Sequence, residues 1–394
     1  MGDDSTVGDR VRRLAKLRGM TQDDLRRASG LSLRTVKDVI GDHGSHRNET
    51  LHKIAKALQV RTSDLTSPGK AEHQPVPGEP WEDVRDALYR RSPQPEPGEP
   101  PTPQGVLAGL ADLMPAWRAN EYSQVRPALP GLVRDALSLD GGEDERAARS
   151  RVLNATAWLF TMTRQFEDGL TAGRLALDAA PGLPDAVAVV STMAWCLLRQ
   201  GRLGEAGDLA VRWADDAEPA RFSRATAAEL AGYGKLLLYV NNSLLRDNRP
   251  GDADDALSMA RTAAARIGRE VQVNASTTMT FGPAQVQVIA AENAAIQEQP
   301  DRVLAIADRL SGPGLARVEP VQRLRHRLDV ANAHAMRRQY PEVVEVMQGL
   351  RREAPEWLGS QQYARDILER IVRRRRGPWT PELRELAEVT RLTA

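Results

Sequence analysis

The chain has 394 residues, 54 Lys and Arg against 53 Asp and Glu, and a single cysteine, Cys196. This length allows two or three domains with a sizeable core, while one cysteine excludes an internal disulfide framework and favours a reducing compartment. The acidic, polar N-terminus does not have the form of a signal peptide, and no apolar run is long enough to span a membrane. We therefore expect a soluble cytoplasmic protein.

Basic residues are concentrated near the N-terminus. Between Arg10 and Arg61 there are 13 Lys and Arg against 5 Asp and Glu, an excess of +8 in a chain whose net charge is only +1. Only six of the basic residues in the chain are Lys, and four of those six lie in this segment. Such a local excess can neutralise phosphates, so it indicates a nucleic-acid partner.

Two short helices joined by a glycine corner are expected between Thr21 and Ile40. Thr21 followed three residues later by Asp24 is an N-cap pattern. Gly30 can adopt the positive φ that ends this helix, and Ser32 can cap a second one. The inward residues of the second helix would be Val36, Val39 and Ile40. Two short helices across such a corner form a helix-turn-helix.

The outward side of the second helix is the expected DNA-reading surface. Arg34, Thr35 and Lys37 lie near its N-terminus, where a recognition helix meets base edges in the major groove. Leu33 can contact a thymine methyl group, and Gln22 is placed to contact the phosphate backbone. The candidate DNA-binding residues are Gln22, Ser32, Leu33, Arg34, Thr35, Lys37, Arg47 and Asn48.

Further helices are expected on both sides of this pair. Upstream, apolar residues recur at helical spacing; downstream, Asn48 can cap a helix with its own apolar stripe. The upstream residues are Val7, Val11, Leu14 and Leu17, and the downstream residues are Leu51, Ile54, Ala55 and Leu58.

Residues 7–65 resemble the XRE family, the lambda-repressor-like helix-turn-helix domain. The resemblance rests on Arg10 to Arg12, Thr21-Gln22 with Leu25, Gly30-Leu31-Ser32, Thr35-Val36, Gly41, Thr50-Leu51, Ile54-Ala55 and Ala57-Leu58. It implies a five-helix DNA-binding domain over residues 1–66. The sequence departs from the family in the long loop before Thr50, which holds His43, His46 and Arg47. The alternative is a domain of the same fold that mediates only protein contacts.

Residues 67–104 are expected to form a connector rich in proline and glycine, because that composition prevents helix and sheet. A short helical segment at 81–91 interrupts it, with Trp81, Val84 and Leu88 on one face. An isolated helix this short is unstable in water. We therefore expect it to dock on a neighbouring domain.

From residue 105 to 394 helix follows helix, and one order of residues returns three times, around Phe166, Leu203 and Tyr340. In each copy a helix and a turn are followed by a second helix that begins with an aromatic residue or leucine and carries small residues one turn apart. Each copy closes at a proline, namely Pro181, Pro219 or Pro355. These features resemble the tetratricopeptide repeat, which implies an α-solenoid with a concave binding face. The predicted fold class is all-α throughout.

Polar and aromatic residues recur on the first helices of the repeats, on the side that should line the concave face. Asparagine can pair with the donor and acceptor of a peptide backbone, and tryptophan supplies an amphipathic wall, so these residues could hold an extended peptide or a small molecule. The alternative is that the tryptophans are core and the asparagines are solvated. The candidate ligand-binding residues are Arg151, Asn154, Trp158, Ser191, Trp195, Asn241, Arg325 and Asn332.

No enzyme, cofactor or metal signature is found, so the predicted protein is not an enzyme and has no cofactor. Residues 271–286 break the helical pattern and form either an ordinary loop between repeats or a lid over the concave face. The run IVRRRR at 371–376 either ends a helix, where the dipole favours cations, or makes a second nucleic-acid contact.

The basic head, proline-rich connector and repeat body together resemble the tetratricopeptide-type regulators of Gram-positive bacteria, especially those of actinobacterial genomes. The resemblance implies a transcription factor that binds a pseudo-palindromic DNA operator as a homodimer. In the first hypothesis a peptide or small signalling molecule bound in the concave face gates DNA binding. In the second, the repeats constitutively recruit a protein partner to DNA, with no small ligand.

Overall fold

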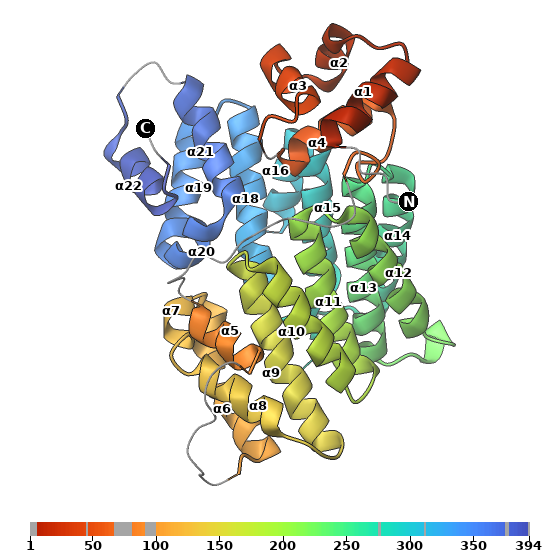
Figure 1. Cartoon of the computed structure of the whole chain (residues 1–394), viewed down its shortest axis with the longest axis vertical. Helices are drawn as coiled ribbons and strands as arrows, with labels where there is room; N and C mark the ends of the chain where they lie inside the picture. The colour runs from red at the N-terminus through yellow and green to blue at the C-terminus, as the bar shows by residue number, and fades with distance from the viewer. Residues whose placement is uncertain are drawn as a thin grey trace.

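The computed structural model describes residues 6–44, 46–66, 81–90, 100–274, 277–310, 313–374 and 378–392 (Figure 1). The described chain is almost entirely helical, which confirms the predicted all-α class. A small N-terminal head lies against the ends of several helices of the larger helical body (Figure 1). None of the helices in the described ranges is long and apolar enough to cross a bilayer.

The head contains the predicted pair of short helices. Thr21 and Asp24 bond reciprocally: the Thr21 hydroxyl accepts the Asp24 N–H at 3.2 Å, and the Asp24 carboxylate accepts the Thr21 N–H at 3.0 Å. Gly30, at φ +67°, ends the first helix, and Ser32 caps the next by accepting the Thr35 N–H at 3.0 Å. The four helices are α1 (Val7–Leu17), α2 (Gln22–Ser29), α3 (Leu33–Ile40) and α4 (Asn48–Leu58).

Three details of the head differ from the expectations. Leu17, at the end of α1, is 76% exposed and lies outside the core. Arg47 rather than Asn48 is the N-cap of α4, and it makes no side-chain capping bond. The fifth helix is reduced to consecutive turns over residues 61–66, because their N–H groups bond only three residues back. These turns still bury Leu65 in the head core.

The body is a stack of helix pairs. Short α5 packs on α8, as expected of a helix too short to be stable alone, and Trp81 and Val84 join the body core. The helices are α5 (Glu82–Leu88), α6 (Pro103–Ala119), α7 (Tyr122–Val125), α8 (Leu129–Ser138), α9 (Glu143–Met162), α10 (Phe166–Ala179), α11 (Leu183–Gln200), α12 (Leu203–Ala217), η1 (Phe222–Arg224), α13 (Ala227–Arg246), α14 (Pro250–Ile267), α15 (Pro283–Ile296), α16 (Pro300–Arg309), α17 (Pro313–Ala316), α18 (Pro320–Met336), α19 (Tyr340–Glu353), α20 (Pro355–Ser360), α21 (Gln362–Arg374) and α22 (Pro381–Val389).

One tight turn recurs inside successive helix pairs. In each, a residue in the left-handed conformation ends the first helix, and the next N–H bonds back to the carbonyl five residues earlier, for example Gln165 to Phe160 at 2.8 Å. This is the Schellman type of helix termination. The left-handed residues are Arg164, Gly201, Asn248, Glu298 and Arg338. The repeated geometry supports the predicted helical solenoid.

The solenoid curls until its two ends meet. Ser123, after the start of α7, donates its backbone N–H to the carboxylate of Glu356 on α20 at 3.0 Å. The middle first helices are therefore enclosed: α11 is buried continuously from Asp185 to Leu198. We call the side formed by the neighbouring first helices α9, α11, α13, α15 and α18 the inner face. It is a narrow interior rather than the open concave groove that was expected.

A short β-hairpin, which the sequence did not predict, occupies the irregular segment before α15. Strands β1 (Val271–Gln272) and β2 (Thr280–Phe281) pair antiparallel, with Val271 opposite Phe281. The Phe281 ring is fully buried against Gly234 of α13, where an added Cβ would lie 2.0 Å from the ring. Glycine at this position therefore anchors the hairpin on the stack.

Candidate nucleic-acid interface

The outward face of α3 is open to solvent. The Arg34 side chain is 92% exposed, and its Nε lies 3.9 Å from an oxygen of Asp38, its nearest acidic group. Lys37 and Leu33 are also exposed. Val36 and Val39 on the opposite side are buried in the head core, so the helix presents its polar side outward. This is the orientation that reading of base edges requires.

Ser32 and Thr35 stiffen the start of this helix. Their hydroxyl oxygens lie 2.8 Å apart, within hydrogen-bond distance. Gln22, at the start of α2, is exposed. Six of the eight candidate residues therefore lie in or near the helix-turn-helix with their side chains at or near the surface.

The other two candidates, Arg47 and Asn48, are turned toward the body. Arg47 forms ion pairs with α21, at 2.9 Å to Asp366 and 3.4 Å to Glu369. Asn48 lies so close to Gly201 that an added Cβ there would be 2.4 Å from the asparagine oxygen. Sequence reasoning could not detect this, because their partners lie far along the chain.

The head rests on the turns inside the helix pairs. Its contacts come from α4 and the turns that follow it, and they reach the turns after α11, α13 and α15 and the helix α21. Lys53 pairs with Glu298 at 2.7 Å and with Glu49 at 3.0 Å. The hydrogen bonds run from Thr62 Oγ1 to the Arg246 carbonyl at 2.8 Å, from Ser63 N–H to Asp247 at 2.7 Å, and from Asn248 Nδ2 to the Val60 carbonyl at 2.9 Å.

This interface is polar. The apolar cores of the head and of the body form separate clusters, and the contacts between them are ion pairs and hydrogen bonds. Partly exposed ion pairs are individually weak and are screened by salt. The docking of the head is therefore open to adjustment by charge and by ionic strength.

A groove of about 520 Å³ separates α3 from α21. Thr35 and Asp38 of α3 line one side, and Arg370 and Arg373 of α21 line the other. Arg373 also pairs with Glu369 at 3.3 Å. The basic end of α21 thus flanks the recognition helix, while Arg375 and Arg376 of the predicted IVRRRR run lie outside the described residues.

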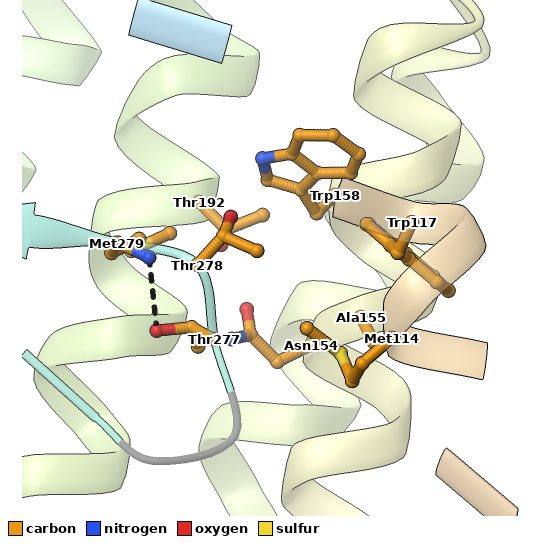
Figure 2. Close-up of a pocket in the computed structure, with 9 residues that line it drawn as sticks. All are labelled: Met114, Trp117, Asn154, Ala155, Trp158, Thr192, Thr277, Thr278 and Met279. Atoms are coloured by element: carbon orange, nitrogen blue, oxygen red, sulfur yellow. Dashed lines mark hydrogen bonds between the residues drawn. The ribbon is translucent and has the colours of Figure 1, made fainter. Parts of the chain in front are cut away.

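On the inner face, Asn154 and Trp158 of α9 lie in one pocket (Figure 2). The Trp158 ring lies 5.9 Å from that of Trp117, and Asn154 is only 4% exposed, with no partner for its side-chain oxygen among the described residues. Figure 2 shows the hairpin residues Thr277 and Thr278 on the far side from Trp117. The free volume is about 20 Å³, room for about one water.

A second set of candidates meets around Trp195 of α11. The guanidinium carbon of Arg325 lies 4.9 Å from the centre of the Trp195 ring, and that of Arg199 lies 5.9 Å from it. Ser191, one turn before Trp195 on α11, is fully buried with no partner for its hydroxyl among the described residues. Arg199 was not among the sequence candidates, although its four-residue spacing from Trp195 places it on the same helix face.

The remaining three candidates have partners within the fold. Arg151 pairs with Asp185 at 2.9 Å. Asn332 accepts a bond from Arg370 at 2.8 Å. Asn241 donates to the Ala253 carbonyl at 2.8 Å and so faces its partner helix α14, not the inner face as expected.

The inner-face position on α13 belongs to the next residue, Asn242. It lies four residues before Arg246, which reaches the inner face to pair with Glu292 at 2.6 Å. The Asn242 side-chain oxygen is a buried atom with no hydrogen-bond partner in the described chain. Counting back from Arg246 at helical spacing would have found it.

Burial shifts several ionisable groups on this face. Burial would raise the pKa of Glu292, but Arg246 and Arg325 outweigh it and hold that pKa below its ordinary value. Burial, with the charge of Glu292, raises the pKa of Asp329 to about 7. Burial lowers the pKa of His326 to about 4 and, with repulsion from Arg325, that of Arg199 to about 9.

A comparison with known protein families gives a match for the head. Residues 10–68 match the model of the Cro/C1-type helix-turn-helix DNA-binding domain. No curated protein matches the chain. The match agrees with the capped α2–α3 pair and with the exposed polar face of α3, so the chain carries a DNA-binding domain of a transcription regulator.

Proposed function

We propose that the protein is a sequence-specific transcriptional regulator that binds a pseudo-palindromic double-stranded DNA operator as a homodimer. The observation that carries this proposal is the outward face of α3, where Arg34 and Lys37 project from a Cro/C1-type domain. One head buries little surface on DNA, and pairing two heads raises affinity and defines the half-site spacing.

The proposed division of labour follows the chain. Residues 1–66 read DNA, residues 67–104 connect, and residues 105–394 form a repeat body of tetratricopeptide type that supplies the dimer contact. The shared left-handed turns of the helix pairs support this assignment of the body. A cytoplasmic location accords with a DNA-binding role.

The proposed regulation is gating by a peptide or small molecule bound on the inner face. The head contacts turns of several helix pairs at once, including Gly201, Asn248 and Glu298. A ligand that changed the curvature of the stack would alter the spacing of those turns and so favour or disfavour the docked head. In the docked head, Arg47 and Lys53 form ion pairs with acidic groups of the body. Release of the head would therefore leave both side chains available to bind DNA phosphates.

A titration with selected DNA tests this proposal. Fragments retained by the full-length protein from sheared genomic DNA define the operator, and its affinity is then measured at fixed salt with and without fractions of a cell extract. We expect two protomers per operator and a change in affinity with an active fraction. Retention of no preferred fragment would refute sequence-specific binding; equal affinities across all fractions would refute gating.

The adaptor function remains the second candidate, favoured by the small free volume beside Asn154, which leaves little preformed space for an effector. In this case the body would recruit a protein to DNA without a small ligand. Co-purification of a stoichiometric partner that is lost on substitution of Asn154 or Trp158, with operator affinity unaffected by any extract fraction, would favour it.

A further inference from the structure

The interior of the solenoid has more positive than negative charge around Trp195. Arg325 and Arg246 share a single carboxylate, Glu292, at 3.3 and 2.6 Å. Arg199, the third guanidinium, has only a neutral partner, the side-chain oxygen of Gln361 at 3.4 Å. Within the described chain, Arg199 forms no ion pair with a carboxylate. An unbalanced cation in a poorly solvated interior is unfavourable unless an anion compensates it.

Neighbouring groups do not supply that anion. Burial and Glu292 raise the pKa of Asp329 to about 7, so much of its population is uncharged at neutral pH. The pKa of His326 is lowered to about 4 by burial, so this side chain adds no positive charge. Arg164 adds a further repulsion on Arg199. Glu292 itself remains ionised and is already shared by two arginines.

The arrangement beside the indole suits an incoming acid. The Arg199 and Arg325 guanidinium carbons lie 5.9 and 4.9 Å from the centre of the Trp195 ring, and the charge of Arg325 acts unfavourably on that of Arg199. The Nε of Arg325 is buried and has no hydrogen-bond partner in the described ranges. Neither arginine is completely buried, and 17% of the Arg325 side chain remains exposed, which leaves a route from solvent.

Buried amides with unpartnered atoms also occur on the neighbouring helices α13, α15 and α18. Gln285 and Gln322 have side-chain atoms without hydrogen-bond partners among the described residues, and Gln285 is 0% exposed. Buried polar groups in folded proteins are normally satisfied by protein, ordered water or a ligand. With Asn242, these amides provide neutral donors and acceptors on the same three helices.

We propose that the inner face binds the anionic group of a ligand, a carboxylate or a phosphate, between Arg199 and Arg325 beside Trp195. This inference rests on the proposed function, because the anion site is the effector site of the proposed regulation. It adds the chemical class of the effector. Guanidinium groups bind both anions through charge-assisted, often bidentate, hydrogen bonds. The buried amides would hold the uncharged remainder of the ligand.

Binding of simple anions to the full-length protein tests the site directly. Inorganic phosphate in one arm and acetate in the other are titrated at constant ionic strength with chloride, while tryptophan fluorescence and the unfolding temperature are followed. We expect a saturable change in both signals with at least one anion, and the stronger arm distinguishes phosphate from carboxylate ligands. A response that never saturates, or that chloride reproduces, would overturn the proposal.

Arg199→Met is the diagnostic variant. It should weaken anion binding by about tenfold or more. Without anion it should unfold at the same or a higher temperature than the unsubstituted protein, because it removes a cation that has no carboxylate partner. Arg323→Met is the matched control: Arg323 lies on α18 with Arg325, but pairs with Glu353 at 3.3 Å. It should leave anion binding unchanged.

Two further measurements separate the possible outcomes. If Arg199→Met does not fold, Trp195→Phe, which keeps both arginines, should remove most of the fluorescence response while the unfolding temperature still rises with anion. Saturable anion binding with no effect on operator affinity would leave the site intact and refute gating through it. If an uncharged compound from the extract changes the operator affinity and the protein binds neither anion, this inference is refuted and the proposed function is left intact.

Discussion

Arg34 is the side chain on which base reading is expected to depend most. It projects from the first turn of α3 and is nearly fully exposed. Replacing it with alanine should cost about 1–3 kcal/mol at the operator and relax the base preference at one position, because it removes a base-edge contact. Gln22→Ala should instead weaken binding to all sequences evenly, since a phosphate contact carries no sequence information. Titrations at fixed salt against the operator and single-base variants measure both effects.

An unchanged affinity of Arg34→Ala for the operator would show that another part of α3 reads the bases. Arg27→Ala is a suitable control, because Arg27 is exposed on α2 and pairs with Asp24 at 2.6 Å. It should leave the base preference unaltered.

Asp329 is expected to make stability fall as pH rises. Its pKa is about 7 in the folded protein because of burial and the nearby Glu292, and about 3.8 in the unfolded chain. Between these values the folded state holds a proton that the unfolded state has released, so the free energy of unfolding decreases with pH. From pH 5 to 8 the loss should be about 1–3 kcal/mol.

Asp329→Asn should abolish most of that loss, since the amide stays neutral throughout. Denaturant unfolding at pH 5 and pH 8 measures it. Asp254→Asn, at an exposed position on α14, serves as the control and should retain the full pH dependence. If Asp329→Asn retained it too, another group would be responsible.

Residue-level predictions succeeded where the determining contacts are local. The capping bonds of Thr21 and Ser32 span only three residues, so the sequence alone specifies the helix-turn-helix and its outward side. Asn241 was misplaced because adjacent helical residues point about 100° apart, so an error of one position changes the face. The unpaired charge of Arg199 depends on Arg325 of α18 and on Gln361 at the end of α20, and could not be predicted from α11.

At the scale of elements, one close contact, between Gly234 of α13 and the Phe281 ring, holds the hairpin on the helix stack. Gly234→Ala should destabilise the fold by about 1–3 kcal/mol, because the added Cβ would overlap the buried Phe281 ring. Gly232→Ala on the same helix meets only Val187, at 3.6 Å. It should be neutral or stabilising by about 0.5–1 kcal/mol, since alanine favours helix. Urea unfolding of the two variants compares them directly, and equal stabilities would contradict the anchoring role of Gly234.

The elements differ in how well sequence predicts them. Long helices repeat their apolar spacing many times, and the paired order around Phe166, Leu203 and Tyr340 was visible for that reason. Strands of two residues are too short to alternate, so the hairpin was not predicted. The recurring left-handed turn inside the helix pairs was not predicted either. Its left-handed position is occupied by Arg, Asn and Glu as well as by Gly, so no single residue type marks it in the sequence.

At the scale of the whole molecule, the docked head was unpredictable. Arg47 and Asp366 lie at opposite ends of the chain, and no periodicity connects them. The sequence indicated a tether between head and body but gave no reason for the head to rest on the turns of the stack. Since the contacts are polar and the cores are separate, the docked and released heads should exchange readily.

This exchange predicts the effect of removing the acidic partners of Arg47. The double variant Asp366→Asn with Glu369→Gln should bind the operator more tightly, because Arg47 becomes available to phosphate. The logarithm of the affinity should also fall more steeply with the logarithm of salt concentration, by about 0.9 for each added phosphate contact. Operator titrations across a series of salt concentrations measure both quantities.

A loss of two negative charges also favours DNA binding at long range, so the control must have the same net charge. Asp301→Asn with Glu353→Gln meets this need, because these residues pair with Arg337, Arg323 and Arg327 of the body and do not contact the head. At high salt the long-range effect is screened, whereas an additional phosphate contact still changes the slope. Equal slopes for the two double variants would mean that Arg47 does not reach DNA on release, and that docking through α21 does not restrain the head.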